Sequence, residues 1–476
     1  MKKNIRVIIS SSGSPTKIAV IKKILTHFTP SYCTLVYVKH KFPLTHYPNI
    51  QWLNFYDLIY GIYPIQWDSC LPIDEPLLRK LSYCETQVLQ MMNRLDWDET
   101  ISYIARKDMY LTHVRFWNNE LLTKKIDMCI FFGIPHEMFD FVLYSLCKIH
   151  AIPTIILESG RHRDTTFLFH DYEQSMQELS HQYNKLLSQP KKTFGISKKF
   201  SRKLTDISFL KMSFIKVYKW RVYETISYIK EVIFIVVKNP KKILFRLLNP
   251  LFLLHRIKSV TKKQLLKLYY QHISKYPDLT KKYVFVALHY QPECTTSPLG
   301  GVYVNQELMV HMLHHTLPDD VLIYVKEHPL PSYTMRSFSF YKSLTTSPRV
   351  VLIRTDANSQ ELMEHSLAVA TVTGTVGWEA IAKQKPILMF GHEYYQFAPG
   401  VFQIDSIESC KQALHKIIDQ TYTPTPQELN IFYRAMENVS IDGYIDDYYK
   451  PQSFLSPSAN IEHLSKALIK EIKSIR

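Results

Sequence analysis

The chain has 476 residues, of which 46% are hydrophobic and 21% are charged, a globular composition and a length that predict two domains and a linker. Its seven cysteines are scattered and form no Cys-x-x-Cys pair, which argues against a disulfide framework or a structural zinc site and favours a reducing cytoplasm. No stretch approaches the roughly 18 apolar residues of a membrane span, and the apolar run after the N-terminus is too short for a secretory signal.

The net charge of +16 comes from one segment. Residues 191–282 contain 23 Lys or Arg and only four Asp or Glu, so the rest of the chain is slightly acidic. The lysines alternate with bulky aliphatic and aromatic residues, a pattern that favours amphipathic helices on an anionic membrane surface. A solvated linker and a nucleic-acid-binding segment are the alternatives, and no RNA-binding signature accompanies the basic residues. We therefore expect an anionic membrane surface, and no nucleic acid, as a partner.

Strands that alternate with helices in the first part of the chain predict parallel βαβ units. The expected strands are 5–10, 32–38, 127–132 and 153–157. The expected helices are 16–27, 75–93, 100–124, 136–150 and 171–187. These elements predict a Rossmann-like domain at 1–190.

The same alternation returns after the basic segment. The expected strands are 283–288, 321–326, 349–354, 368–372 and 386–390. The expected helices are 305–315, 359–366, 376–384, 406–419, 426–437 and 461–475. The predicted fold is therefore α/β, with a second Rossmann-like domain at 281–440, a basic and largely helical linker at 191–280, and a tail with a helix at 441–476.

The strand at 321–326 runs into Lys326-Glu327-His328-Pro329. Pro329 cannot continue a central strand, so it presents His328 at the carboxyl edge of the sheet, where open α/β sheets bind their ligands. An imidazole there can hydrogen-bond a phosphate or protonate a leaving oxygen, and Lys326 is grouped with it as a phosphate contact. The alternative for His328 is a hydrogen bond to a loop carbonyl.

A second motif, Thr373-Gly374-Thr375-Val376-Gly377, joins a buried strand to a helix. Gly374 and Gly377 let the backbone approach a ligand closely, Thr375 is expected to cap the helix, and Thr373 and Thr375 offer hydroxyl donors. Free amides at a helix N-terminus suit a phosphate. The motif is not a Walker loop, because no Gly-Lys-Ser/Thr follows it. The alternative is an ordinary capped turn.

Two further features of this half are candidates for donor binding. Glu379, in the first turn of the same helix, can accept ribose hydroxyls, or is simply favoured there by the helix dipole. Gln291 and Glu293 follow the strand at 283–288, and Gly300-Gly301 comes next. We expect this loop to be mobile and either to close over a ligand or to form a long surface connection.

The N-terminal half has its own polar residues at strand ends. His136 follows the strand at 127–132 and Glu158 follows the strand at 153–157. Either can be the base that activates an acceptor hydroxyl; a solvated loop residue or a helix cap is the alternative for each.

One Asp-x-Asp sequence occurs, Asp96-Trp97-Asp98. Such a pair can hold a divalent cation against a nucleotide diphosphate. Here it lies between two expected helices, not at a strand end, so capping of the following helix is the better interpretation. We expect no metal and no cofactor.

Residues 283–391 resemble bacterial capsule polysaccharide biosynthesis proteins, a family that includes transferases of Kdo or sialic acid from CMP-activated donors. The resemblance rests on the following segments: His289-Tyr290-Gln291-Pro292-Glu293, Lys326-Glu327-His328-Pro329, Thr373 to Ala380, and Lys385-Pro386. It covers about a quarter of the chain firmly and extends more weakly to 126–158.

The resemblance implies a GT-B architecture, in which two Rossmann-like domains face each other across a cleft. The C-terminal domain would hold the nucleotide donor and the N-terminal domain the acceptor. His328 resembles the His-Pro histidine that meets the donor phosphate. Thr373 and Thr375 stand where related sialyltransferases carry a Ser/Thr pair that binds phosphate.

The expected function is a metal-independent glycosyltransferase that transfers a sugar from a nucleotide donor, with a CMP-sugar favoured, to capsule or another surface polysaccharide. Expected partners are the donor, a lipid-linked or polysaccharide acceptor and other capsule assembly proteins, at the cytoplasmic face of the cell membrane. A glycerophosphate-type transferase that uses a CDP-alcohol is one alternative. A non-catalytic nucleotide-binding subunit of a capsule assembly complex is the other.

Overall fold

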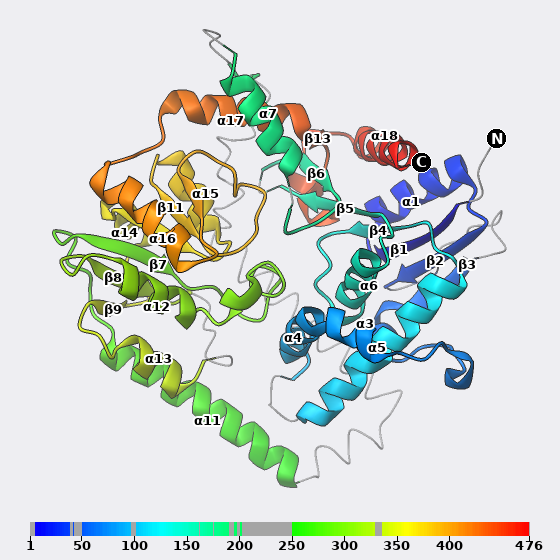
Figure 1. Ribbon diagram of the computed structural model, residues 1–476, viewed down its shortest axis with the longest axis horizontal. Helices are drawn as coiled ribbons and strands as arrows, with labels where there is room; N and C mark the ends of the chain where they lie inside the picture. Colours follow the sequence, from blue (N-terminus) through cyan, green and yellow to red (C-terminus); the bar gives the residue numbers. More distant parts are fainter. Residues whose placement is uncertain are drawn as a thin grey trace.

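The computed structural model describes residues 5–38, 41, 50–96, 101–160, 162–174, 176–189, 195–197, 200–201, 250–328 and 336–475. It contains two α/β domains, each built on its own sheet (Figure 1). Of the basic segment at 191–282, residues 202–249 lie outside the described residues, so the expectation of helices is not addressed for them.

The N-terminal sheet has seven strands in the order β13-β6-β5-β4-β1-β2-β3. Its strands are β1 (Arg6–Ser12), β2 (Tyr32–Tyr37), β3 (Ile50–Asn54), β4 (Met128–Phe132), β5 (Thr154–Ser159), β6 (Thr165–Phe169) and β13 (Ile441–Asp442). The five strands from β3 to β5 are parallel, and β6 and β13 are antiparallel additions at one edge. All five residues of β4 are buried, as expected for a central parallel strand covered on both faces.

Helices cover both faces of this sheet. They are α1 (Pro15–Phe28), α2 (Phe55–Ile59), α3 (Glu75–Lys80), α4 (Ser82–Met91), α5 (Tyr103–Thr123), α6 (Met138–Ile149) and α7 (Gln177–Leu187). The single helix predicted at 75–93 is two helices, because the chain breaks at Leu81, the C-cap of α3. The predicted strands are all present, but the sequence pattern missed β3, β6 and β13.

The C-terminal sheet has six strands, all parallel, in the order β12-β11-β10-β7-β8-β9. They are β7 (Tyr283–Ala287), β8 (Leu322–Lys326), β9 (Val350–Ile353), β10 (Ala368–Thr371), β11 (Ile387–Met389) and β12 (Val401–Gln403). The helices are α11 (Pro250–Ile273), α12 (Glu307–Thr316), α13 (Phe338–Leu344), α14 (Ser359–His365), α15 (Thr375–Ala382), α16 (Ile407–Leu414) and α17 (Pro426–Val439). The prediction of two Rossmann-like domains with parallel sheets is confirmed.

The C-terminal residues do not form a separate tail. Strand β13 pairs with β6 of the first sheet, and α18 (Pro457–Ser474) buries Leu464, Leu468 and Ile472 in the core that contains α1. Helix α17 packs against α7, with the rings of Tyr183 and Phe432 in contact, so the chain crosses back to the N-terminal domain at α17. That domain therefore consists of the expected segment up to residue 190 and of this second segment.

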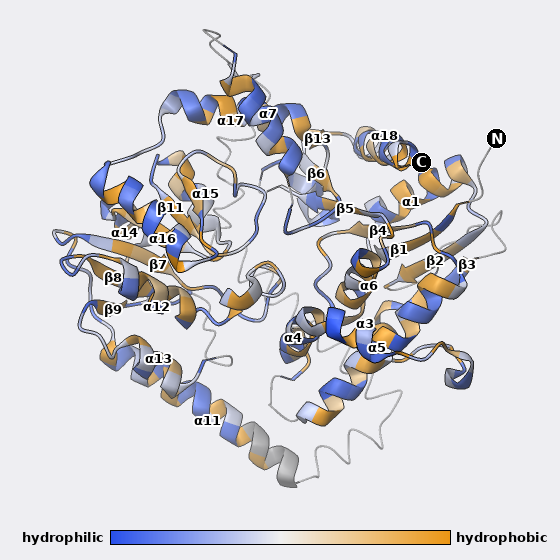
Figure 2. Cartoon of the chain, viewed as in Figure 1, coloured by the Kyte–Doolittle hydropathy of each residue, from blue (hydrophilic) through white to orange (hydrophobic). Residues whose placement is uncertain are grey.

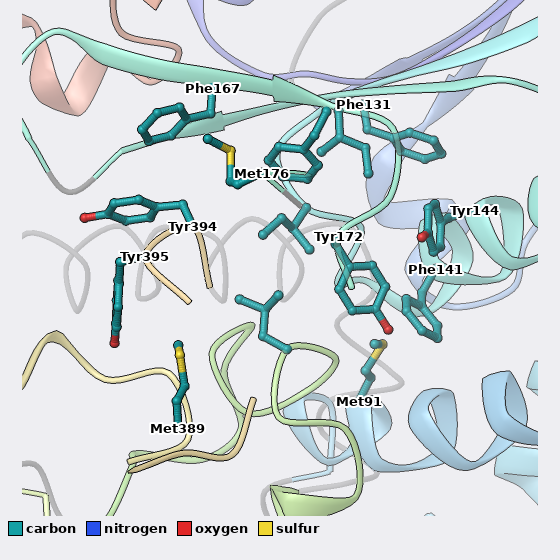
Figure 3. Close-up of a cluster of buried hydrophobic side chains, with 14 of the residues drawn as sticks. Met91, Phe131, Phe141, Tyr144, Phe167, Tyr172, Met176, Met389, Tyr394 and Tyr395 are labelled. Carbon is teal, nitrogen blue, oxygen red and sulfur yellow. The ribbon is translucent and has the colours of Figure 1, made fainter. Parts of the chain in front are cut away.

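The two domains meet through an apolar interface. Phe167 of β6 stacks on Tyr394, with ring centroids 5.2 Å apart, and His162 packs edge-on against Trp378 at 4.4 Å. Phe167, Trp378 and Tyr394 belong to one buried cluster that continues through both domains, and Figure 3 shows Phe167 beside Tyr394. The carboxyl ends of the two parallel sheets are consequently held close to each other.

Within the described parts of the chain, none of the helices combines the length and apolarity needed to cross a bilayer.

Candidate functional site

Each sheet has one point at which the strand order reverses. In the C-terminal sheet it lies between β7 and β10, and in the N-terminal sheet between β1 and β4. Open α/β sheets bind ligands beside the carboxyl ends of the strands at this reversal. The polar residues predicted from the sequence follow these strands or their neighbours.

His289, directly after β7, joins the two strand ends at the C-terminal reversal. Its Nε2 accepts a hydrogen bond from the Thr373 amide at 3.1 Å and lies 3.3 Å from Oγ1 of Thr371. An accepting Nε2 carries no proton, so the ring in this arrangement is the neutral tautomer protonated on Nδ1. His289 is buried, with 5% of its surface exposed. Its hydrogen bond with the Thr373 amide helps to fix the turn at residues 373–377.

The turn itself differs from the sequence expectation in two details. Gly374 is the N-cap of α15 and Thr375 is its first residue, so Thr375 does not cap the helix. Thr373 has no exposed surface, and its hydroxyl donates to the Thr295 carbonyl at 2.7 Å. Thr373 thus supports the turn, and the first amides of α15 together with the half-buried Thr375 are the groups left to meet a phosphate.

Both glycines of the turn are needed for close packing. A Cβ on Gly377 would lie 2.7 Å from the Tyr395 hydroxyl, and a Cβ on Gly374 would lie 2.8 Å from Oγ1 of Thr371. The Tyr395 hydroxyl also donates to the Gly374 carbonyl at 2.5 Å. The glycines therefore serve the packing beneath the turn as well as any approach of a ligand above it.

The three residues at the end of β8 have different environments. Lys326 is buried and its Nζ donates to Oγ of Ser359 at 2.6 Å; burial lowers the pKa of this amine. His328 is only partly buried, and its ring lies 6.0 Å from that of Tyr290. Of the three, His328 is the side chain that the strand end presents to the surface, whereas Lys326 is turned into the domain.

Glu327, the third residue, forms a buried ion pair that the sequence did not reveal. Its Oε1 accepts from Arg336 Nε at 2.8 Å and from the Tyr341 hydroxyl at 2.9 Å. The Arg336 guanidinium also donates to Oε1 of Gln291 at 2.9 Å and to the His289 carbonyl at 3.1 Å. Both ionised side chains are 2% exposed. Arg336 therefore links the carboxyl ends of β7 and β8.

The loop after β7 is a compact turn. Gln291 is buried and donates to the Val304 carbonyl at 2.5 Å, so it belongs to the arginine network. Glu293 is exposed, and its carbonyl accepts from the amides of Thr296 and Ser297. Backbone hydrogen bonds order this loop, and residues 296–300 are buried, so the predicted closure over a ligand stays a prediction. Gly301, with φ of 52°, continues it into a short 3-10 helix.

Glu379 lies beside α14. Its carboxylate accepts a hydrogen bond from Nε2 of Gln360, and burial raises its pKa above the usual value for glutamate. The side chain keeps its second oxygen for another donor, so the predicted role toward a ribose stays a prediction.

In the N-terminal domain, a single residue between β4 and α6 orients both predicted acceptor-side groups. The Ile134 amide donates to Oε2 of Glu158 at 3.0 Å, and the Ile134 carbonyl lies 2.6 Å from Nδ1 of His136. The carbonyl accepts the Nδ1 proton, so Nε2 of His136 is the nitrogen with a lone pair. The structure therefore brings His136 and Glu158 to one loop, at the carboxyl ends of β4 and β5.

Electrostatics make Glu158 a proton acceptor near neutral pH. Its pKa is raised to about 7, mainly by burial; the carboxylates of Glu393 and Asp446 contribute to this rise, and the Ile134 hydrogen bond and Lys17 oppose it. A carboxyl group with this pKa can take up a proton in neutral solution. Burial likewise lowers the pKa of His136, which keeps that imidazole neutral.

Glu158 faces residues of both domains. Glu393 follows β11 of the C-terminal sheet and is 7% exposed, and its carboxylate is among the groups that raise the pKa of Glu158. Arg94 spans the same interface: its guanidinium donates to the carbonyl of His136 and, at 2.8 Å, to the carbonyl of Ser297. Glu393 follows the expected strand at 386–390, but neither its effect on Glu158 nor the contacts of Arg94 could be read from the sequence, because both depend on the approach of the two domains.

Asp96 has a structural role. Its carboxylate pairs with Arg106 at 2.8 Å and accepts from the Ile101 amide at 3.0 Å. Asp98 lies outside the described residues. Among the residues that the structure does describe, no cluster of three or more His, Cys, Asp or Glu is arranged to hold a metal ion.

A comparison with models of known protein families finds a match within the C-terminal domain. Residues 260–417 match the family model of the capsule polysaccharide biosynthesis proteins. The match contains β7 to β12 and every donor-side residue discussed above, so the predicted resemblance is confirmed for this domain.

Solved structures with a similar arrangement are distant in sequence. The β-Kdo 2,7-transferase of KpsC from Thermosulfurimonas dismutans is 12% identical, with 98% of this chain and 99% of that chain covered and a TM-score of 0.34. The UDP-GlcNAc 2-epimerase of Methanocaldococcus jannaschii is 10% identical, with 92% and 98% covered and a TM-score of 0.27. No curated protein sequence matches the chain.

Proposed function

We propose that the protein is a glycosyltransferase of capsule or other surface polysaccharide synthesis, with the nucleotide-sugar donor bound by the C-terminal domain. The observation that carries this proposal is the pairing of two strand-end sites. One offers helix amides and a histidine, and the other offers a carboxyl group whose pKa is near 7. The family match over the donor-side residues supports it.

On the donor side, the leaving group is a nucleotide phosphate, so catalysis consists mainly of stabilising the negative charge that develops on it. The N-terminus of α15 and the Thr375 hydroxyl are suited to that charge. His328, at the end of β8, donates a hydrogen bond or a proton to the leaving phosphate. We favour a CMP-sugar, and no metal or cofactor is required in this scheme.

On the acceptor side, Glu158 removes the proton from the attacking hydroxyl. Its Oε2 already accepts from Ile134, so Oε1 is the oxygen that takes the proton. His136, on the same loop, positions the hydroxyl through its Nε2 lone pair. The acceptor is a lipid-linked or polysaccharide chain, and we place the protein at the cytoplasmic face of the membrane, where such acceptors and other capsule assembly proteins meet.

Replacing His328 by alanine is expected to lower kcat by about a hundredfold, because the developing phosphate charge loses its donor. His365, an exposed histidine at the end of α14, gives the matched control, and His365→Ala should retain wild-type turnover. A steady-state assay with nucleotide-sugar and acceptor measures both. Normal turnover in His328→Ala would remove this residue from the mechanism.

The two alternative functions predict different results in the same assay. A CDP-alcohol transferase would add phosphorus to the acceptor, which mass spectrometry detects. A nucleotide-binding assembly subunit would bind nucleotide without hydrolysis or transfer. Loss of activity on addition of EDTA would contradict the metal-independent scheme.

A further inference from the structure

Helix α11 carries apolar side chains on two opposite faces. Leu266 and Tyr270 point inward and are fully buried in the C-terminal core. Leu254, Ile257, Val260, Leu265 and Leu268 are between 50% and 62% exposed. At 3.6 residues per turn these five fall within one face of about 140°, which points away from Leu266 and Tyr270. We call these five residues the outer face of α11.

The charges of α11 are arranged around that face. Lys258 and Lys267, both exposed, lie just beyond its two edges at the same helical spacing. The helix contains five Lys or Arg and no Asp or Glu. Thr261 and Gln264, which share the face, are uncharged. An apolar stripe with lysines on both flanks is suited to a surface that is apolar inside and anionic outside.

The position of α11 leaves this face accessible. The helix runs along the margin of the C-terminal domain, away from the N-terminal sheet (Figure 1). Figure 2 shows hydrophobic and hydrophilic residues mixed along the coloured part of α11. A cluster of exposed aliphatic side chains of this kind marks an interaction surface.

We propose that the outer face of α11 docks on an anionic lipid bilayer, with Leu254, Ile257, Val260, Leu265 and Leu268 inserted among the lipids and Lys258 and Lys267 at the headgroups. The charge pattern favours a bilayer over an acidic protein, because the lysines flank the apolar face instead of interrupting it. The inference deepens the proposed function by naming the surface that brings the enzyme to a lipid-linked acceptor.

Docking at α11 is linked to the donor side by a short chain of contacts. The Tyr270 hydroxyl accepts from the Glu327 amide at 3.1 Å and donates to the Ile353 carbonyl at 2.6 Å. The inner face of α11 therefore holds the backbone at the end of β8, next to His328. A bilayer that fixes α11 also fixes the height of the donor site above the lipid.

Vesicle flotation with the full-length protein tests the proposal without any enzyme activity, so its failure is separate from failure of the proposed function. The wild type should float with vesicles of phosphatidylglycerol and phosphatidylcholine and should not float with phosphatidylcholine alone. Ile257→Asp/Leu268→Asp should lower the bound fraction at least about tenfold. Lys258→Glu/Lys267→Glu should do so as well.

The controls are matched in exposure and chemistry. Ile62→Asp/Ile104→Asp changes two exposed aliphatic residues of the N-terminal domain, and Lys411→Glu/Lys470→Glu changes two exposed lysines elsewhere. Both should bind as the wild type does, and all variants should keep the wild-type melting temperature. Wild-type flotation of the α11 variants, or equal binding to neutral and anionic vesicles, would overturn the proposal.

Discussion

Glu158→Gln is expected to lower kcat at least about a hundredfold, because the glutamine cannot take a proton from the acceptor. In the wild type, kcat/KM should rise with pH through about 7, since burial raises the pKa of Glu158 to about 7 and only the ionised form is a base. The variant should lack this rise. Assays between pH 5.5 and 8.5 measure both effects, and Glu178→Gln, at an exposed carboxylate of α7, is the control.

The melting temperature of Glu158→Gln distinguishes a catalytic role of Glu158 from a structural one. A glutamate whose pKa is raised by folding binds its proton more tightly in the folded protein, so its contribution to stability falls as pH rises from 4.5 to about 7. Glutamine removes that loss and can still accept from the Ile134 amide. Glu158→Gln should therefore melt at the same temperature as the wild type, or higher, at pH 8. A less stable and fully active variant would contradict the assignment.

Arg336→Met is expected to reduce the free energy of unfolding by about 3–5 kcal/mol, because it leaves the Glu327 carboxylate buried without a counter-charge. Urea denaturation measures the change. Glu327→Gln/Arg336→Met should recover at least half of the loss, since it removes both buried charges. The matched control is Arg79→Met, which breaks an exposed ion pair with Glu75 and should cost under about 1 kcal/mol. Equal losses for the two arginine variants would contradict a buried network.

The longer strands of both sheets could be predicted because a buried strand is a run of apolar residues, which is visible in the sequence. The run Met128 to Phe132 is apolar throughout and is buried throughout. Short strands give no such signal: β12 has three residues and β13 has two, and they form only against a neighbouring strand. The amphipathic pattern of α18 predicted a helix, but not that it packs in the N-terminal domain.

The candidate site was predictable to the level of strand ends. Sequence placed His328 and His136 after the correct strands, because a polar residue that follows a buried run lies at the sheet edge. Glu158, expected to follow its strand, is the last residue but one of β5. It did not show which way a side chain points. The sequence suggested that the Thr373 hydroxyl binds a phosphate, but in the structure this hydroxyl donates to the Thr295 carbonyl.

The groups that the sequence missed depend on contacts between distant residues. Arg336 meets Gln291, 45 residues earlier, and no local pattern marks it. His289 stood after an expected strand and began one of the segments that carry the family resemblance, but its contact with the turn at residues 373–377 could not be read from the sequence. Glu393 acts on Glu158 of the N-terminal domain, and Arg94 of the N-terminal domain donates to the Ser297 carbonyl of the C-terminal domain.

The central claim is that the N-terminus of α15 holds the phosphate of a nucleotide donor, and titration calorimetry tests it most directly. CMP, CDP and UDP are titrated in EDTA into the wild type, into Thr375→Glu, and into Gln427→Glu, which adds the same charge to the first turn of α17. We predict that a cytidine nucleotide binds the wild type and Gln427→Glu equally, and Thr375→Glu at least about tenfold more weakly. Binding of none of the three nucleotides, or equal binding to Thr375→Glu, would contradict the account.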